Sequence, residues 1–242
     1  MGLKLMCVTA HPDDECYGFG GALALAADRG IETYVVCLTD GQAATNRGDA
    51  GTAEALGKMR CEEFRRSCEV LGVTQHELMD YHDGRLEFVE FSLAAKRMVE
   101  RMRRFRPDVV ITFGGDGGQN THADHMVASM LTTAAFHWAG QAKRYPDTGN
   151  PHQAKRLYYV TANFHMPDRP PALMMPWTVT LDIRSARERK SEAFRQHVSQ
   201  RPLMEKTKDI FERYGAEEFY ALVATTETRP AHQSTDLFEG LV

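Results

Sequence analysis

Two groups of histidine and acidic side chains carry most of the chemical information in this sequence. Residues 11–15 hold one histidine and three acids within a single short turn, and residues 122–125 hold two histidines and an aspartate. Like charges a few ångströms apart repel each other, so three acids in one turn are costly unless a cation lies between them. The two groups together therefore predict a site for one divalent metal ion.

The residue types also indicate what such a metal would do. Two histidines and one carboxylate, with open coordination positions, match catalytic zinc and non-haem ferrous iron. A metal held in this way lowers the pKa of a bound water to about 7 and polarises a carbonyl or phosphoryl oxygen. A further carboxylate can accept the proton of the water, and a further histidine can stabilise an oxyanion or protonate the leaving group. The groups present are sufficient for a mononuclear metal hydrolase.

Strands and helices are expected to alternate along the chain. Strands are expected at residues 3–10, 31–38, 78–81, 109–113, 156–161, 178–183 and 219–225. Helices are expected at residues 17–29, 52–71, 91–105, 121–139, 186–198 and 203–214. The pattern predicts an α/β, Rossmann-like fold with a mostly parallel twisted sheet flanked by helices, and residues 1–242 forming a single domain.

Three polar clusters follow expected strands of this sheet. Residues 11–15 follow the first strand, Asp40 and Gly41 follow the second, and residues 116–125 follow the strand at 109–113. Because ligands of open parallel sheets bind at the carboxyl ends of the strands, these clusters are expected to meet at one edge. Acids at a helix start can also simply complement the helix dipole, and we expect Glu15 to do only this.

Composition narrows the classes of partner. The chain has 43% hydrophobic residues and a formal net charge of −4, which gives no reason to expect nucleic acid as a partner. The basic stretches at residues 101–106 and 184–190 are interpreted as solvated helix faces. No segment has the length and apolarity of a membrane span. Five cysteines without a Cys-x-x-Cys pair favour a reduced, cytoplasmic protein.

The two groups also carry a family resemblance. The run Ala-His-Pro-Asp-Asp-Glu at residues 10–15, paired with His-Ala-Asp-His at residues 122–125, resembles the signature of the LmbE-like, or PIG-L, de-N-acetylases. Further similar features are Thr39-Asp40-Gly41, Arg60 with Glu63, the late set Lys190, Ala193, His197 and Gln200, and Asp236-Leu237-Phe238. The resemblance spans nearly the whole chain. It implies a zinc-dependent hydrolase, with Fe2+ as an alternative metal, that removes the N-acetyl group from an N-acetylglucosamine-type amino sugar or its conjugate.

The same resemblance assigns roles to the residues of the two groups. It implies that His11, Asp14 and His125 bind the metal. Asp13 would then be the general base, and His122 would act as the acid or stabilise the oxyanion.

The other residues of the expected site have several different roles. The resemblance implies that Asp124 orients a histidine and that Arg60 contacts a polar group of the substrate, whereas an exposed helix arginine is the alternative for Arg60. His197 either lines the pocket or caps its helix. Asn120 stands where some family members have a tyrosine that assists the oxyanion. Tyrosines that could replace it from elsewhere are Tyr81, Tyr158 and Tyr159.

Three other functions remain open at this point. An amidase of a larger acyl group or a thiol conjugate would need the same metal site. A metal phosphoesterase usually needs more carboxylates or a second metal. A non-catalytic metal-binding or nucleotide-binding module is suggested by the glycines at 114–118, which lack the spacing of a phosphate-binding loop. The loop at 42–51 and the connection at 165–176 are expected to shape the part of the pocket that selects the substrate, and a homo-oligomer is one expectation from the family.

Overall fold

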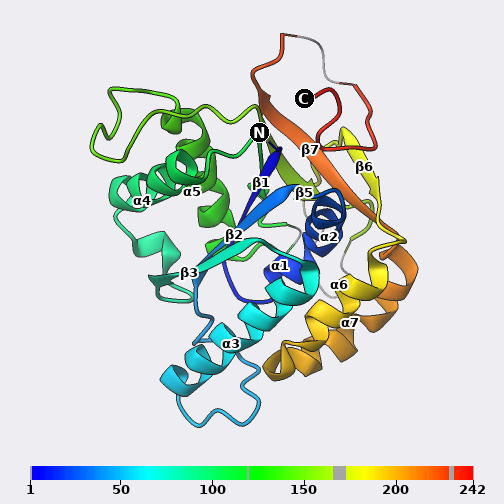
Figure 1. Ribbon diagram of the computed structural model, residues 1–242. Helices are drawn as coiled ribbons and strands as arrows, with labels where there is room; N and C mark the ends of the chain where they lie inside the picture. The colour runs from blue at the N-terminus through cyan, green and yellow to red at the C-terminus, as the bar shows by residue number, and fades with distance from the viewer. Residues whose placement is uncertain (1, 119, 166–172, 229–231, 242) are drawn as a thin grey trace.

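The structure is a computed structural model that describes residues 2–118, 120–165, 173–228 and 232–241. Its centre is a seven-stranded sheet in the order β3-β2-β1-β4-β5-β7-β6, with helices on both faces (Figure 1). The pairs from β3 through β5 are parallel, whereas β7 pairs antiparallel with both β5 and β6. The expected α/β, mostly parallel sheet is confirmed.

The element bounds agree closely with the sequence pattern. The strands are β1 (Lys4–Thr9), β2 (Glu32–Thr39), β3 (Gln75–Tyr81), β4 (Val109–Phe113), β5 (Arg156–Thr161), β6 (Val179–Asp182) and β7 (Glu217–Thr225). The helices are α1 (Asp14–Tyr17), α2 (Gly20–Asp28), α3 (Ala53–Leu71), α4 (Phe91–Phe105), α5 (Ala123–Ala139), α6 (Arg187–Arg195) and α7 (Arg201–Tyr214), with short 3-10 turns η1 (Leu86–Phe88) and η2 (Val198–Gln200). Of the connections considered from the sequence, residues 119 and 166–172 lie outside the described residues.

The order of the strands determines where a ligand can bind. Helices α4 and α5 pack together on one face of the sheet, and α2, α3 and α6 pack on the other (Figure 1). The chain winds away from β1 in one direction through β2 and β3, and in the other through β4 and β5. In such a sheet the ligand-binding crevice opens beyond the carboxyl ends of the two strands between which the winding direction reverses. Here these strands are β1 and β4. Both candidate groups follow these two strands.

The helix expected at residues 17–29 is instead two helices, α1 and α2. The break places the backbone N–H groups of Gly21 and Ala22 at the start of α2, where they donate to Glu218 at 2.7 and 2.9 Å. A Cβ atom on Gly21 would lie 2.4 Å from Ile183, so only glycine permits this approach. The new helix start thus holds a buried carboxylate of β7, which the local sequence does not reveal.

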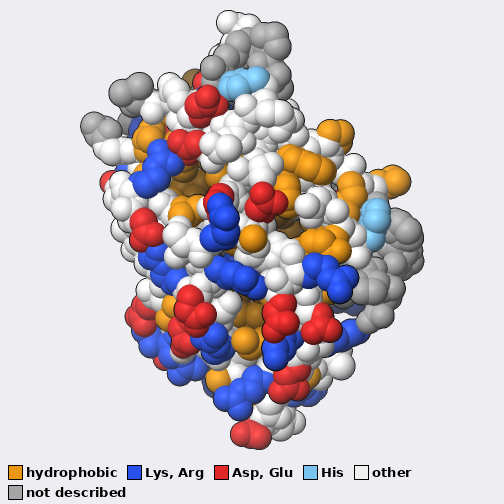
Figure 2. All heavy atoms as spheres, turned by 90° about the vertical axis from the view of Figure 1, so that its right-hand side faces the viewer, with side chains coloured by type: hydrophobic (Ala, Val, Ile, Leu, Met, Phe, Trp, Pro, Cys, Tyr) orange, Lys and Arg blue, Asp and Glu red, His pale blue; other side chains and the backbone are white. Residues whose placement is uncertain are grey.

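Each of the two basic stretches holds both exposed and buried side chains. Arg184 and Arg189 pair with Asp182 and Asp28, and Figure 2 shows basic and acidic side chains interspersed over this face. The prediction of a solvated face is wrong for Arg101, Arg103 and Lys190, which are buried. Arg103 is 4% exposed and donates to several backbone carbonyls between residues 138 and 149. Arg103 therefore fastens the α5–β5 connection to α4, because a buried guanidinium must have its donors satisfied.

Two expectations drawn from the composition concern the cysteines and the helices. Cys7 and Cys37 lie buried in β1 and β2, and all five cysteines are unpaired. Among the described residues, none of the helices combines the length and the apolar character that crossing a bilayer requires.

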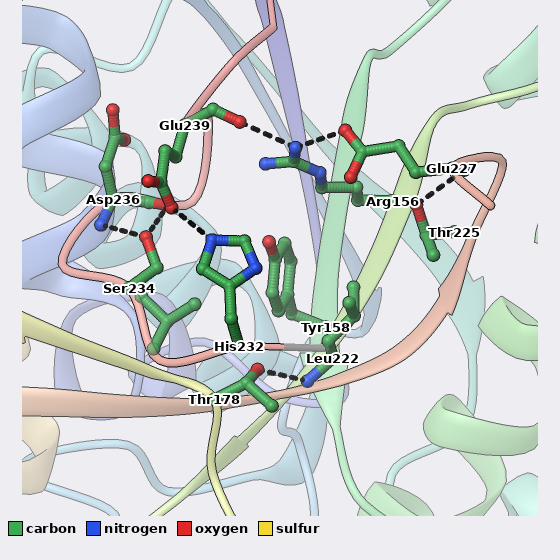
Figure 3. A pocket seen from close by; sticks show the side chains of 11 residues that line it. Arg156, Tyr158, Thr178, Leu222, Thr225, Glu227, His232, Ser234, Asp236 and Glu239 are labelled. Atoms are coloured by element: carbon green, nitrogen blue, oxygen red, sulfur yellow. Dashed lines mark hydrogen bonds and ion pairs between the residues drawn. The ribbon is translucent and has the colours of Figure 1, made fainter. Parts of the chain in front are cut away.

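A buried arginine anchors the C-terminal segment to the sheet. Arg156, at the start of β5, donates to the backbone oxygens of Leu237 at 3.0 Å and Glu239 at 2.6 Å, and it pairs with Glu227 (Figure 3). Its side chain is 3% exposed. Leu237 and Phe238 are buried beside it, so the Asp-Leu-Phe run at the end of the chain is part of the core.

We expect Arg156→Met to lower the free energy of unfolding by about 2–3 kcal/mol, because it removes the hydrogen bonds to two backbone carbonyls and the buried ion pair with Glu227. Arg184→Met is the matched control, since Arg184 is 77% exposed and exposed pairs contribute at most about 1 kcal/mol. Urea unfolding of both variants measures the difference. Equal free energies for the two would show that Arg156 does not anchor the segment.

Candidate metal centre and active site

A cavity of about 230 Å³ lies at the carboxyl ends of β1 and β4. Its lining includes six of the residues expected from the sequence: His11, Asp13, Asp14, Arg60, His122 and His125. The seventh, Asp124, lies beneath His11 and is 1% exposed. The fold therefore brings residues separated by more than a hundred positions into one site.

The side chains of His11, Asp14 and His125 converge on one point of this cavity. The Nδ1 atom of His11 lies 3.1 Å from Nε2 of His125, and the Asp14 oxygens lie 3.6 Å from the former and 3.3 Å from the latter. Ligand atoms placed 2.0–2.1 Å from a tetrahedral zinc ion lie about 3.3 Å from one another. The spacing and the donor types of the three residues therefore fit one divalent cation.

Each of these three side chains is held by a second contact. Nε2 of His11 lies 3.0 Å from Asp83 and 3.2 Å from Asp124, while Nδ1 of His125 lies 2.9 Å from the carbonyl of Gly117. Asp14 accepts hydrogen bonds from the backbone N–H groups of residues 10 and 11 at 3.1 and 2.8 Å. Outer contacts of this kind fix the orientation and tautomer of metal-binding histidines.

The charges of the site favour a cation at this point. Burial disfavours the charged form of His11, but the hydrogen bonds that its ring donates to Asp124 and Asp14 outweigh it and raise the pKa of His11 well above its usual value. Burial likewise opposes ionisation of Asp14, yet His125 and His11 hold the pKa of Asp14 well below its usual value. The surroundings thus stabilise positive charge between the two imidazoles and the carboxylate, as a bound metal would provide.

Asp13 is held in an unusual backbone conformation beside the three residues. Its φ angle is 110°, a region that non-glycine residues rarely adopt and that is costly unless neighbouring contacts impose it. Its carboxylate lies 3.2 Å from Arg60. Burial raises the pKa of Asp13 to about 6, and the Arg60 charge opposes part of this effect.

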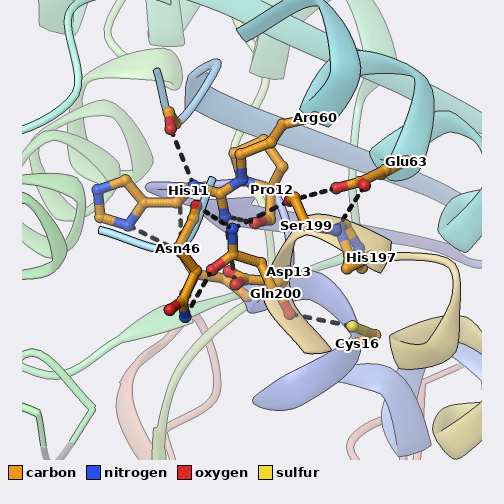
Figure 4. A network of polar contacts seen from close by, with 12 residues as sticks. His11, Pro12, Asp13, Cys16, Asn46, Arg60, Glu63, His197, Ser199 and Gln200 are labelled. Carbon is orange, nitrogen blue, oxygen red and sulfur yellow. Dashed lines mark hydrogen bonds and ion pairs between the residues drawn. The ribbon is translucent and has the colours of Figure 1, made fainter. Parts of the chain in front are cut away.

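Arg60 lies beneath Asp13 and is almost completely buried, so the alternative of an exposed helix arginine is wrong. It donates to the carbonyl of Gly41 at 3.0 Å and to the carbonyl of Pro12 (Figure 4). A Cβ atom at Gly41 would lie 2.1 Å from the Arg60 guanidinium, so the Thr39-Asp40-Gly41 run needs its glycine here. Arg60 borders the cavity, but these contacts with the protein hold the Asp13 turn in place.

Glu15 is fully buried, so the prediction that it only favours a helix start is wrong. It accepts hydrogen bonds from the backbone N–H of Asp13 at 2.9 Å, from Ser67 at 2.5 Å and from His197 at 2.7 Å. The expectation that His197 lines the cavity is wrong, and although His197 is the residue before η2, its side chain makes no capping contact. Instead, Glu15 and His197 tie α1 to the region after α6, and Glu63 similarly accepts from Ser199 (Figure 4).

His122 precedes the first turn of α5, which begins at Ala123 rather than at residue 121. Its Nδ1 accepts a hydrogen bond from the backbone N–H of Asp124 at 3.2 Å, so its proton resides on Nε2. Burial and the nearby His11 and His125 lower the pKa of His122. The ring is therefore neutral and can donate a hydrogen bond from Nε2. The carboxylate of Asp124 orients His11 rather than His122.

Two residues of the site were missed in the sequence. Asp83 contacts His11, and its position just after β3 could have indicated it, because the carboxyl ends of parallel strands meet at one edge. Tyr17 lines the cavity, whereas Tyr81, Tyr158 and Tyr159 do not. Of the alternatives left open by the sequence, Asn120 or one of these three tyrosines, only Asn120 lines the cavity. Asn120 lines the cavity and accepts from the backbone N–H of His122 at 2.7 Å.

Fold and site together define an α/β protein with a histidine–aspartate–histidine group at the switch point of a parallel sheet. The family model PIG-L, GlcNAc-PI de-N-acetylase, matches residues 6–136, and the chain belongs to this family. The resemblance seen in the sequence is thereby confirmed.

Individual relatives differ in how much of their length is matched. A 1D-myo-inositol 2-acetamido-2-deoxy-alpha-D-glucopyranoside deacetylase of Rhodococcus jostii is 28% identical, with 98% of each chain covered. A mycothiol S-conjugate amidase of Streptomyces coelicolor is 30% identical over 65% of this chain, but this chain spans only 60% of the amidase. The solved structure of diacetylchitobiose deacetylase from Pyrococcus horikoshii has a TM-score of 0.75 at 22% identity, covering 91% of this chain and 83% of that one.

We expect the three converging side chains to bind one zinc ion per chain. Asp124→Asn should weaken zinc binding by about 10–100-fold, because it disturbs the contact that orients His11. His125→Ala should weaken it further, while His76→Ala, an exposed histidine, should not. Competition titration with a chromophoric chelator gives the affinities. Zinc affinity in His125→Ala equal to that of the unaltered chain would contradict the site.

We expect His197→Ala to lower the free energy of unfolding by about 2–3 kcal/mol, because Glu15 would stay buried without one of its donors. His137→Ala, at an exposed position of α5, is the control and should change it by less than about 0.5 kcal/mol. Chemical denaturation followed by circular dichroism measures both. A similar, small change in the two variants would show that the Glu15–His197 contact is not important for stability.

Proposed function

We propose that this chain is a zinc-dependent hydrolase that removes the N-acetyl group from an N-acetylglucosamine-type amino sugar or its conjugate. The observation that carries the proposal is the convergence of His11, Asp14 and His125 in one cavity, with Asp13 and His122 beside them. The membership of the PIG-L family and the deacetylase relative matched over 98% of both chains support the reaction and the substrate class. The unpaired cysteines favour a reducing, cytoplasmic location.

In this proposal His11, Asp14 and His125 hold the zinc ion. When bound, the metal lowers the pKa of a water molecule and polarises the amide carbonyl. Asp13 accepts a proton from the water as its oxygen bonds to the carbonyl carbon. Nε2–H of His122 donates a hydrogen bond to the carbonyl oxygen as negative charge develops on it.

The second half of the reaction returns the proton. As the carbon–nitrogen bond breaks, Asp13 passes its proton to the leaving amine, so the products are acetate and a free amino sugar. Arg60 supports this exchange by holding Asp13 in position from beneath, through the ion pair at 3.2 Å. Asp83 and Asp124 keep the His11 ring in the orientation that leaves Nδ1 directed at the metal site.

A second candidate reaction is the cleavage of a larger amide. The amidase relative is 30% identical over 65% of this chain, which supports this alternative. The same residues would act in the same roles, since both reactions hydrolyse an amide carbonyl. The two differ only in the acyl group and the amine that the cavity must accept, so substrate comparison separates them.

We expect release of a primary amine from N-acetylglucosamine conjugates by the zinc-loaded chain, and Asp13→Asn should reduce kcat by about 10²–10⁴-fold because the amide cannot accept the proton. Fluorescamine detection measures the amine, with ferrous iron compared under anaerobic conditions. Zinc content measured in parallel should be the same in Asp13→Asn as in the unaltered chain. Full activity in Asp13→Asn would refute its role as base, and phosphate release from phosphate esters without any amine release would favour a phosphoesterase.

A further inference from the structure

A second, apolar cavity adjoins the candidate metal site. It has a volume of about 120 Å³ and shares Tyr17 and Gly18 with the larger cavity. A Cβ atom placed on Gly18 would meet only a backbone oxygen of Asp14, at 3.5 Å, so the space above this residue is open. A ligand bound in the metal cavity can therefore extend past Gly18 into the second one.

The wall of this second cavity is largely apolar, and aromatic rings form a third of its residues. Its ring-bearing residues come from α1, the end of β5, α7 and β7: Tyr17, Phe164, Phe211, Tyr214 and Phe219. Phe164 and Tyr214 stack with ring centres 4.3 Å apart and planes at 11°, and Tyr17 packs edge-on against Phe211 at 5.0 Å. Aromatic and apolar linings of this kind bind apolar ligand groups by removing them from water.

The charges in the wall do not favour a charged ligand. Lys190 and Glu218 are buried and paired with each other at 2.7 Å, and Glu218 also accepts from Tyr220 at 2.8 Å and from the start of α2. Among the wall residues that the structure describes, the third charged one is Glu217, which is exposed. Since Lys190 is already neutralised, the charge that these described residues leave over is negative and repels an anionic group.

We infer that this cavity binds an uncharged, apolar aglycone, one aromatic ring or a short alkyl chain, attached to the amino sugar whose acetamido group lies in the metal cavity. The inference rests on the proposed function, since it names the substrate class of that same site. A protein cavity of about 150 Å³ holds benzene, so a cavity of about 120 Å³ that opens towards the metal site has room for at most one ring and none for a second sugar.

The experiment compares phenyl, methyl and malyl glycosides of N-acetylglucosamine as substrates of the zinc-loaded chain. The phenyl glycoside should show a kcat/KM at least about tenfold above that of the methyl glycoside, and the malyl glycoside should show no advantage. Tyr214→Ala, which removes one wall, and Ala162→Leu, which fills the cavity, should each bring the phenyl-to-methyl ratio close to one. Lys208→Ala is the control on the same helix, because Lys208 is 72% exposed, and it should keep the ratio of the unaltered chain.

A phenyl-to-methyl ratio near one in the unaltered chain would overturn the inference, and so would a ratio that neither Tyr214→Ala nor Ala162→Leu reduces. Binding of the deacetylated phenyl and methyl glucosaminides, measured by titration calorimetry, tests the cavity without turnover. If no N-acetyl sugar yields an amine, the proposed function fails, while the calorimetric ratio still decides whether the cavity takes an apolar aglycone.

Discussion

The concentration of negative charge around His11 is the constraint on which the rest of this structure depends. Three carboxylates, those of Asp14, Asp83 and Asp124, lie within 3.6 Å of its ring nitrogens, and Asp13 lines the same cavity. Buried like charges at this spacing are unfavourable unless positive charge lies among them. The imidazoles supply part of it, and a divalent cation between His11, Asp14 and His125 would supply the rest. The folding of this edge of the sheet and the binding of a metal are therefore linked.

Behind the metal site, a second set of polar contacts keeps the Asp13 turn in its strained conformation. Arg60 from α3 holds the carbonyl of Pro12 and the carboxylate of Asp13, and Glu15 holds the backbone N–H of Asp13. His197 then links Glu15 to the region after α6. Because these groups are buried and bonded to one another, they form a support for the residue proposed as base. Arg60 and His197 therefore have a structural role in supporting the Asp13 turn, although neither is among the three residues expected to bind the metal.

The two adjoining cavities suit different parts of a substrate, because their linings differ in polarity. The larger cavity contains the imidazole groups of the site and the carboxylates beside them, and it suits the polar amide and sugar. The smaller one is aromatic, and its buried charges are paired internally. Tyr17 and Gly18 stand between them. The reaction therefore depends on the turns after β1 and β4. The choice of substrate depends on other parts of the chain, namely α7 and the ends of β5 and β7.

The sequence by itself determined the alternation of strands and helices and the two groups of metal-binding residue types. Local patterns suffice for these, because burial on both faces gives continuous apolar strands and because ligands cluster within single turns. The bounds of β4, β5 and α4 were predicted without error. Only the tertiary structure decided that Glu15 is buried against His197, that Asp83 joins His11, that Arg103 is buried and that an aromatic cavity opens beside Tyr17. Each of these depends on side chains from elements distant in the sequence, for example 182 positions apart for Glu15 and His197. No local pattern specifies which distant partner a polar or aromatic side chain will meet.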